Sequence, residues 1–244
     1  MIGDAERPAF YALGRGDGGL GDWLTLLHPP YTLWHLSYVA IGAALEPRLV
    51  LWRLAGTLVA FLLALGVGAH ALDELHGRPL RTGISRRVLI AAATLSIGTA
   101  MAMGLAYGGF RMLPFVVLGG ALVYGYNLEL FGGRIHNAVG FAAAWGAFPV
   151  MVGAYAQHWS ISPAAVIGAL AAFLLSLCQH ALSTPARKLR RRTHAVTARL
   201  TLSDGAEEQL GRAELLAPLE LALRTLTGAV VALALALVLA NSGA

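Results

Sequence analysis

Two adjacent carboxylates, Asp73 and Glu74, end a long apolar run and are followed by Arg78 and Arg81. A second basic group follows a later apolar run and contains no carboxylate. Carboxylates are ligands that Mg²⁺ accepts, and arginine forks bind phosphate oxygens in pairs. The pattern predicts a metal-assisted phosphate site or, as the plainer alternative, helix-end carboxylates neutralised by arginines that mainly set the topology. The second group contains Arg187, Lys188 and Arg190.

Two histidines occupy equivalent places in a short internal repeat. His70 lies in Ala69-His70-Ala71-Leu72, and His180 lies in Gln179-His180-Ala181-Leu182, each at the end of an apolar run and before a basic stretch. Such histidines are metal or haem ligands, or hydrogen-bonded residues at a membrane surface. The repeat itself is what a parallel duplication of half the molecule would produce.

The elements that must position these residues are apolar helices. The chain has 244 residues, of which 57% are hydrophobic and 13% are charged, whereas soluble domains carry about 25% charged residues. The charges are confined to short stretches between apolar runs of a length that crosses a bilayer. We therefore predict an all-α integral membrane protein with about seven transmembrane helices. The runs are 31–46, 49–72, 87–107, 112–126, 137–157, 161–184 and 218–240.

Positive charge alternates along the connections between these runs. The connections at 73–87, 127–136 and 185–217 are basic, whereas those at 108–111 and 158–160 carry one arginine and none. Basic loops stay in the cytoplasm, so we predict a multi-pass protein of the cytoplasmic (inner) membrane with a cytoplasmic N-terminus. The net charge of +5 then faces anionic lipid, not nucleic acid.

The chain divides into four parts on this interpretation. Residues 1–30 form a polar N-terminal segment, 31–184 a six-helix membrane core, 185–217 a basic cytoplasmic loop and 218–240 the seventh helix. Within the loop, apolar residues recur at helical spacing, which predicts a short amphipathic helix over Ala206–Leu216.

Several motifs of this chain resemble those of the UbiA-type intramembrane prenyltransferases. They are Leu27-His28-Pro29 before the first helix, the run from Arg78 to Ser85 after the second, Tyr124-Gly125-Tyr126-Asn127 after the fourth, and Gly132-Gly133-Arg134-Ile135-His136-Asn137 before the fifth. The resemblance spans residues 24–190. It implies a UbiA-like helix bundle with a cavity that opens to the cytoplasm.

The resemblance also implies roles for individual residues. Asp73 and Glu74 would be catalytic and would hold Mg²⁺ against an isoprenoid diphosphate in the membrane. Tyr124 and Tyr126 would line the prenyl pocket or stabilise a carbocation, although aromatic residues also anchor helices at the membrane surface. The remaining substrate-binding residues would be Arg78, Arg81, Asn137, Arg187, Lys188 and Arg190.

This sequence departs from the family pattern in its carboxylates. Only Asp73 matches an aspartate of the first Asp-rich motif, the second motif (aligned with His180–Lys188) has no carboxylate, and Phe131 stands where the family has a lysine. Seven predicted helices replace the usual nine. Two hypotheses follow: a divergent prenyltransferase, or a non-catalytic membrane subunit, assembly factor or lipid or pigment carrier, with a possible membrane-protein partner.

Overall fold

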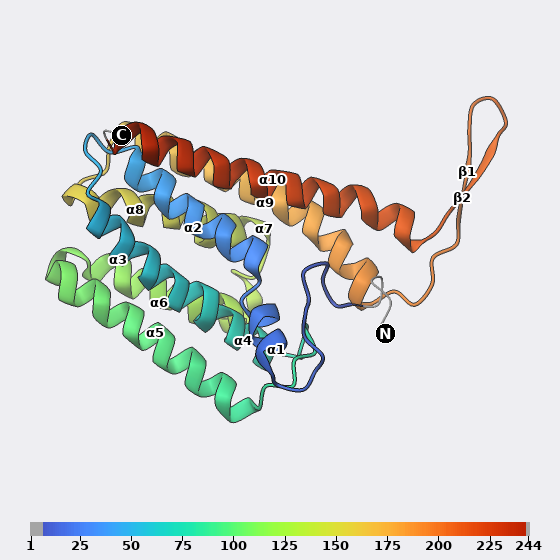
Figure 1. Cartoon of the computed structure of the whole chain (residues 1–244), viewed down its shortest axis with the longest axis horizontal. Coiled ribbons are helices and arrows are strands. Elements are labelled where there is room, and N and C mark those ends of the chain that lie inside the picture. The colour runs from blue at the N-terminus through green and yellow to red at the C-terminus, as the bar shows by residue number, and fades with distance from the viewer. Residues whose placement is uncertain (1–6, 243–244) are drawn as a thin grey trace.

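The computed structural model describes residues 7–242 as a bundle of long helices with a small hairpin (Figure 1). The first half contains α1 (Leu20–Leu26), α2 (Pro29–Ala44), α3 (Leu51–Phe61), η2 (Leu62–Ala69), α4 (His70–Leu75), α5 (Arg86–Gly108), η3 (Gly109–Arg111) and α6 (Leu113–Asn127). The second half contains η4 (Leu130–Gly133), α7 (Ala138–Ala142), η5 (Ala143–Ala147), α8 (Phe148–His158), α9 (Pro163–Arg191), β1 (Ala198–Thr201), β2 (Glu207–Leu210) and α10 (Arg212–Asn241).

Within residues 7–242, five continuous helical segments are long and apolar enough to cross a membrane, which confirms an all-α architecture of membrane type. The two remaining predicted runs fold as α2 and α6, which are shorter, with 16 and 15 residues. In Figure 1, α1 and the hairpin lie at one end of the bundle and the C-terminal end of α10 lies at the other. The five long segments are 51–75, 86–111, 138–158, 163–191 and 212–241.

Polar residues at helix starts fix where several of these helices begin. Ser85 accepts a hydrogen bond from the Val88 N–H before α5, and Ser162 accepts one from the Ala165 N–H before α9. Pro163 follows Ser162 at the first helical position, where its missing N–H costs nothing. These caps fix the starts of α5 and α9, and the Ser85 cap also ends the loop that follows α4.

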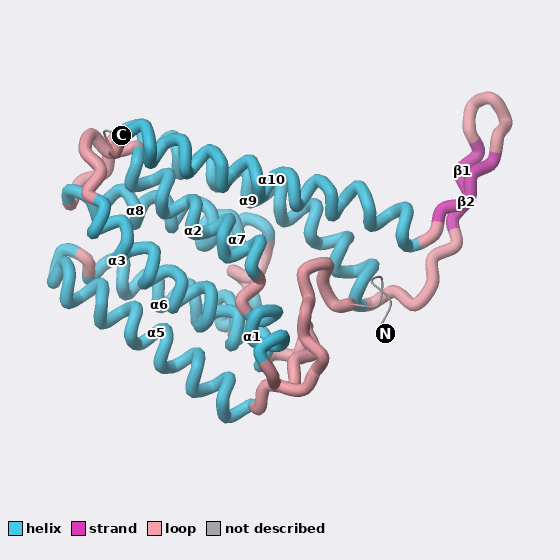
Figure 2. Tube along the Cα trace, in the orientation of Figure 1, coloured by secondary structure: helices cyan, strands magenta, loops and turns pink. Residues whose placement is uncertain are grey.

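The segment after α9 differs from the predicted amphipathic helix. Residues 198–210 form an antiparallel hairpin, seen as the only strands among the described residues in Figure 2. Ser203-Asp204-Gly205 turns the chain, with Gly205 at φ +86°, and Arg199 pairs with Glu207 across the strands at 3.1 Å. The predicted helix over Ala206–Leu216 is therefore wrong for residues 206–211, because turn geometry and cross-strand pairing outweigh the apolar spacing there. Residues 212–216 are helical and form the start of α10.

The last helix also begins earlier than predicted. α10 begins at Arg212, six residues before the expected start, and Pro218 lies inside it. Its first six residues thus precede the predicted apolar run. Glu220, in the third turn of α10, pairs with Arg190 of α9.

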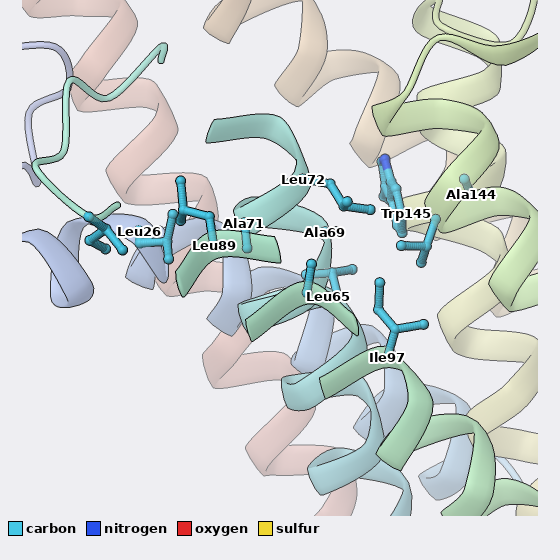
Figure 3. Packing of buried hydrophobic residues seen from close by; sticks show 12 residues of the cluster. Leu26, Leu65, Ala69, Ala71, Leu72, Leu89, Ile97, Ala144 and Trp145 are labelled. Carbon is cyan, nitrogen blue, oxygen red and sulfur yellow. The ribbon is translucent and has the colours of Figure 1, made fainter. Parts of the chain in front are cut away.

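Two helices contain π-helical turns at the centre of the bundle. η2 separates α3 from α4, and η5 separates α7 from α8. A π-turn inserts one extra residue into a helix and is frequent at functional sites. Leu65 of η2 and Trp145 of η5 both pack with Ile97 in the main buried cluster (Figure 3), so both π-turns face the same part of the core.

Candidate functional site: a polar cavity beside an apolar pocket

A cavity of about 570 Å³ lies at the end of the bundle that carries the basic loops. α2, α4 and α9 contribute its walls, and residues 8–11 of the N-terminal segment cover part of it. Five of the sequence-predicted site residues line it: Asp73, Tyr126, Arg187, Lys188 and Arg190. Asp73 and the basic end of α9 are far apart in the sequence, and both therefore contribute to one cavity.

Asp73 is the carboxylate that the cavity places among the arginines of α9. Arg191 and Arg187 are the cations whose charges act most strongly on it. Among the described residues neither arginine forms an ion pair with a carboxylate within 4.0 Å. Their guanidinium groups are thus available to an anion that enters the cavity.

Glu74 points away from the cavity and into the following loop. Its carboxylate accepts hydrogen bonds from the Leu80 N–H at 2.9 Å, the Thr82 N–H at 2.8 Å and the Thr82 hydroxyl at 2.9 Å. The side chain is fully buried. The structure therefore separates the two carboxylates that the sequence suggested as a joint metal site, because consecutive helical side chains point about 100° apart.

Arg78 and Arg81 shape the same loop instead of lining the cavity. Arg78 donates to the carbonyls of Thr82 (2.8 Å) and Ile84 (2.7 Å). Arg78 and Arg81 both have positive φ, at +52° and +56°, a region that non-glycine residues seldom adopt. The loop is therefore wound tightly around Glu74, and these arginines do not meet Arg187.

The N-terminal segment is bound to this loop through Asp22. The Asp22 carboxylate accepts from the N–H groups of Gly16 (3.0 Å), Gly18 (2.7 Å) and Gly83 (2.7 Å). Burial opposes ionisation of Asp22, but these backbone donors outweigh it and lower its pKa. Asp22 thus fastens the segment beside the cavity.

Tyr126 lines the cavity, whereas Tyr124 and Asn137 do not. Tyr126 stacks on His136 with ring centroids 4.4 Å apart. Tyr124 packs against the main apolar cluster. Asn137 caps α7, where its side-chain oxygen accepts from the Gly140 N–H at 2.9 Å and its amide donates to the Arg134 carbonyl at 2.7 Å.

The basic end of α9 also holds the N-terminal segment in place. Arg191 donates to the Pro8 carbonyl at 3.1 Å, and Arg190 donates to both carboxylate oxygens of Glu220. Arg190 is a buried residue whose charge is paired inside the protein, while Lys188 is exposed at the edge of the cavity. Arg187 and Arg191 are therefore the better placed anion ligands.

Histidines form much of the wall of the polar cavity, and the sequence predicted only some of them. Six of the eight histidines line the cavity. His35, which lies in an apolar helix seven residues after His28, was not predicted from the sequence as a site residue. A spacing of seven places two residues on one face of a helix, and this spacing from His28 could have indicated that His35 faces the same cavity. The six are His28, His35, His70, His76, His136 and His180.

A second, apolar pocket of about 260 Å³ lies deeper in the bundle, between α3, α5, α6 and α8. Its lining is formed mainly by small, aliphatic and aromatic side chains. Leu65 of η2 and Trp145 of η5 line both the polar cavity and the apolar pocket. The two spaces are therefore adjacent, with these two side chains between them.

The carboxylates of the cavity are dispersed. Across residues 7–242, no cluster of three or more His, Cys, Asp or Glu side chains is placed to hold a metal ion. Glu74 is satisfied by the loop, and Glu220 is paired with Arg190. Mg²⁺ is commonly held by one or two carboxylates together with substrate phosphate oxygens and waters, and the other carboxylates that line the cavity are Asp73 and Glu129.

Compared with known proteins, the chain matches no family model, no curated protein and no solved structure. The resemblance to UbiA-type enzymes therefore stays a prediction from the motifs.

Proposed function

We propose that this protein binds an amphiphilic lipid with a phosphorylated head, of the isoprenoid phosphate or diphosphate type, inside a UbiA-like seven-helix membrane bundle. The observation that carries the proposal is that a polar, arginine-lined cavity and an apolar pocket lie side by side, with Leu65 and Trp145 in the walls of both. A ligand with one charged end and one apolar end matches both spaces at once.

The charged end of such a ligand would lie on Arg187 and Arg191. Arginine forms paired, charge-assisted hydrogen bonds with phosphate oxygens. These arginines carry no carboxylate partner among residues 7–242, so a phosphate would supply the missing negative charge without a metal ion.

The apolar chain would pass Leu65 and Trp145 and occupy the deeper pocket. Phe61, Met101 and Phe148 are among the side chains that would surround it. Burial of each methylene there contributes about 0.8 kcal/mol. The chain would therefore provide much of the affinity, and the head group would provide the orientation.

The distribution of charge supports a membrane orientation with the cavity toward the cytoplasm. Of the 18 Lys and Arg residues, Arg48, Arg53 and Arg111 lie at the end of the bundle away from the cavity, and most of the others lie in or beside the basic loops. By the positive-inside rule, seven crossings by the seven apolar helical segments place those loops in the cytoplasm.

Titration of the purified protein in nanodiscs of uncharged lipid with farnesyl diphosphate tests this function. We expect binding in the presence of a chelator, and a dissociation constant at least tenfold larger for Arg187→Gln, about 1.4 kcal/mol. Arg86→Gln is the matched control, since Arg86 is exposed at the same end and does not line the cavity. Equal affinity of both variants contradicts the proposal.

Prenyl transfer is a second candidate, favoured by the position of Asp73 beside Arg187 and Arg191. In that reaction the bond between C1 and the diphosphate oxygen breaks, pyrophosphate leaves with the electron pair, and a nucleophile bonds to C1 and releases a proton. The arginines would stabilise the departing pyrophosphate. Asp73→Asn should then lower pyrophosphate release by about two orders of magnitude, about 3 kcal/mol; release that is absent from the wild type leaves binding as the function.

A further inference from the structure

The inner wall of the polar cavity contains buried polar atoms without partners. Among the described residues, Gln179 Oε1 and His28 Nε2 make no hydrogen bond, although the two side chains are only 5% and 7% exposed. Both residues line the cavity. Native proteins satisfy nearly all such atoms, so these two atoms point to a ligand group that completes them.

Two further histidines of this wall have a fixed tautomer. His35 Nδ1 lies 2.8 Å from the Trp145 carbonyl oxygen, and His70 Nδ1 lies 3.1 Å from the Gly66 carbonyl oxygen. A carbonyl oxygen only accepts, so each Nδ1 carries the proton, and each neutral ring leaves Nε2 as an acceptor. Both carbonyls belong to the π-turns, which ties the tautomers to the helix geometry.

His28 completes this wall as an uncharged group. It stacks on His70 with ring centroids 4.2 Å apart, and its Nδ1 is hydrogen-bonded to the Tyr11 hydroxyl at 2.6 Å. Burial first, and then the nearby charges of His70, Arg191 and Arg187, hold the pKa of His28 well below its usual value. Its backbone is left-handed, at φ +46°, so the site keeps it in a strained conformation.

We propose that the inner wall, defined as His28, His35, His70 and Gln179, is a subsite for an uncharged polyol group. The atoms that await partners at His35, His70 and Gln179 are acceptors, so the ligand must donate, as hydroxyls do. A cationic donor is disfavoured because Arg187 and Arg191 carry positive charge nearby. The proposal rests on the proposed lipid-phosphate function and adds a second chemical requirement to the same cavity.

Binding of 1-O-decylglycerol and of its dimethyl ether, in nanodiscs of uncharged lipid, tests the subsite. The ether keeps the chain and the acceptors but loses both donors. We expect the wild type to bind the diol at least tenfold more tightly than the ether, and Gln179→Leu to remove that preference. Because Gln179 Oε1 has no protein partner, the melting temperature of Gln179→Leu without ligand should be unchanged or higher.

Gln157→Leu is the matched control. Gln157 is also buried, but its Oε1 accepts from the Val50 N–H at 2.8 Å far from the cavity. This variant should melt at a lower temperature and keep the preference for the diol. Equal binding of diol and ether by the wild type, or a preserved preference in Gln179→Leu, overturns the polyol subsite.

A parallel titration with farnesyl phosphate separates this proposal from the proposed function. Binding of farnesyl phosphate that depends on Arg187, together with equal affinity for diol and ether, leaves the function and overturns the subsite. Absence of farnesyl phosphate binding, together with a diol preference that Gln179→Leu removes, overturns the function and supports the subsite.

Discussion

At the scale of single residues, two carboxylates that are adjacent in the sequence have different surroundings in the structure. Asp73 and Glu74 are neighbours, yet Asp73 lines the cavity and Glu74 organises the loop at 78–82. The sequence predicted a paired metal site because both are carboxylates. It offered no means of knowing which side of α4 would face α9, since that depends on tertiary packing and on the π-turn that precedes α4.

Replacement of Glu74 should therefore affect folding and leave ligand contacts intact. Glu74→Gln turns an amide toward the N–H groups of Leu80 and Thr82 and loses buried, charge-assisted hydrogen bonds. We expect a loss of about 2 kcal/mol in the free energy of unfolding, measured by thermal denaturation. Glu129→Gln, at an exposed position of the cavity rim, should change the stability little. A large change in lipid-phosphate affinity with unchanged stability in Glu74→Gln would contradict this role.

Asp22 should give the protein an acid-sensitive attachment of its N-terminal segment. Its pKa is lower in the folded state than in the unfolded chain, where it is near 3.9. Its stabilising contribution is therefore complete above about pH 4 and is lost as the pH falls through the folded pKa. Asp22→Asn should melt at a lower temperature than the wild type at pH 7, and the difference should shrink below pH 4. A difference that is constant from pH 7 to pH 3 would contradict this sign.

At the scale of elements, the apolar runs located the helices well, and their ends less well. The run predicted at 218–240 became α10 from Arg212, and the first part of the predicted amphipathic helix became strand β2 of the hairpin. Apolar periodicity does not show where a helix ends, because a helix can continue for one or more polar turns beyond its apolar residues. One readable signal did exist in α9: Ser176, Gln179 and Ser183 are buried at helical spacing, a polar stripe that a lipid-facing helix would not carry.

Close helix crossing should depend on particular glycines. In Gly153 of α8, an added Cβ would collide with the Val39 carbonyl of α2, whereas an added Cβ at Gly98 of α5 meets nothing within 4 Å. Gly153→Ala should therefore cost roughly 1–3 kcal/mol through forced separation of the helices. Gly98→Ala should be neutral or stabilising, since alanine favours helix more than glycine does. Equal melting temperatures for the two variants would contradict this packing.

At the scale of the whole molecule, charge segregation predicted which loops come together. The basic connections after the second and sixth runs were expected at one end, and the structure places Asp73 and Arg187 in one cavity there. The adjacent apolar pocket was not predictable in detail, because its wall includes residues of two π-turns that have no sequence signature of their own.

Membrane orientation can be measured with single cysteines in a Cys178→Ser background. Ser203 lies in the hairpin turn at the cavity end, and Ser160 lies between α8 and α9 at the other end; both are exposed. A membrane-impermeant maleimide applied to intact cells should label Ser160→Cys and spare Ser203→Cys. Labelling of Ser203→Cys from outside would reverse the proposed topology.

Native mass spectrometry of the purified protein asks most directly whether the two adjacent cavities hold a lipid with a phosphorylated head. We expect the wild type to carry such a lipid, with fragments that identify a phosphate and a long apolar chain. Occupancy should fall at least fivefold in Arg187→Gln and persist in Arg86→Gln. A wild type that carries only neutral lipids, or equal occupancy by a phosphorylated lipid in both variants, would contradict the proposed function.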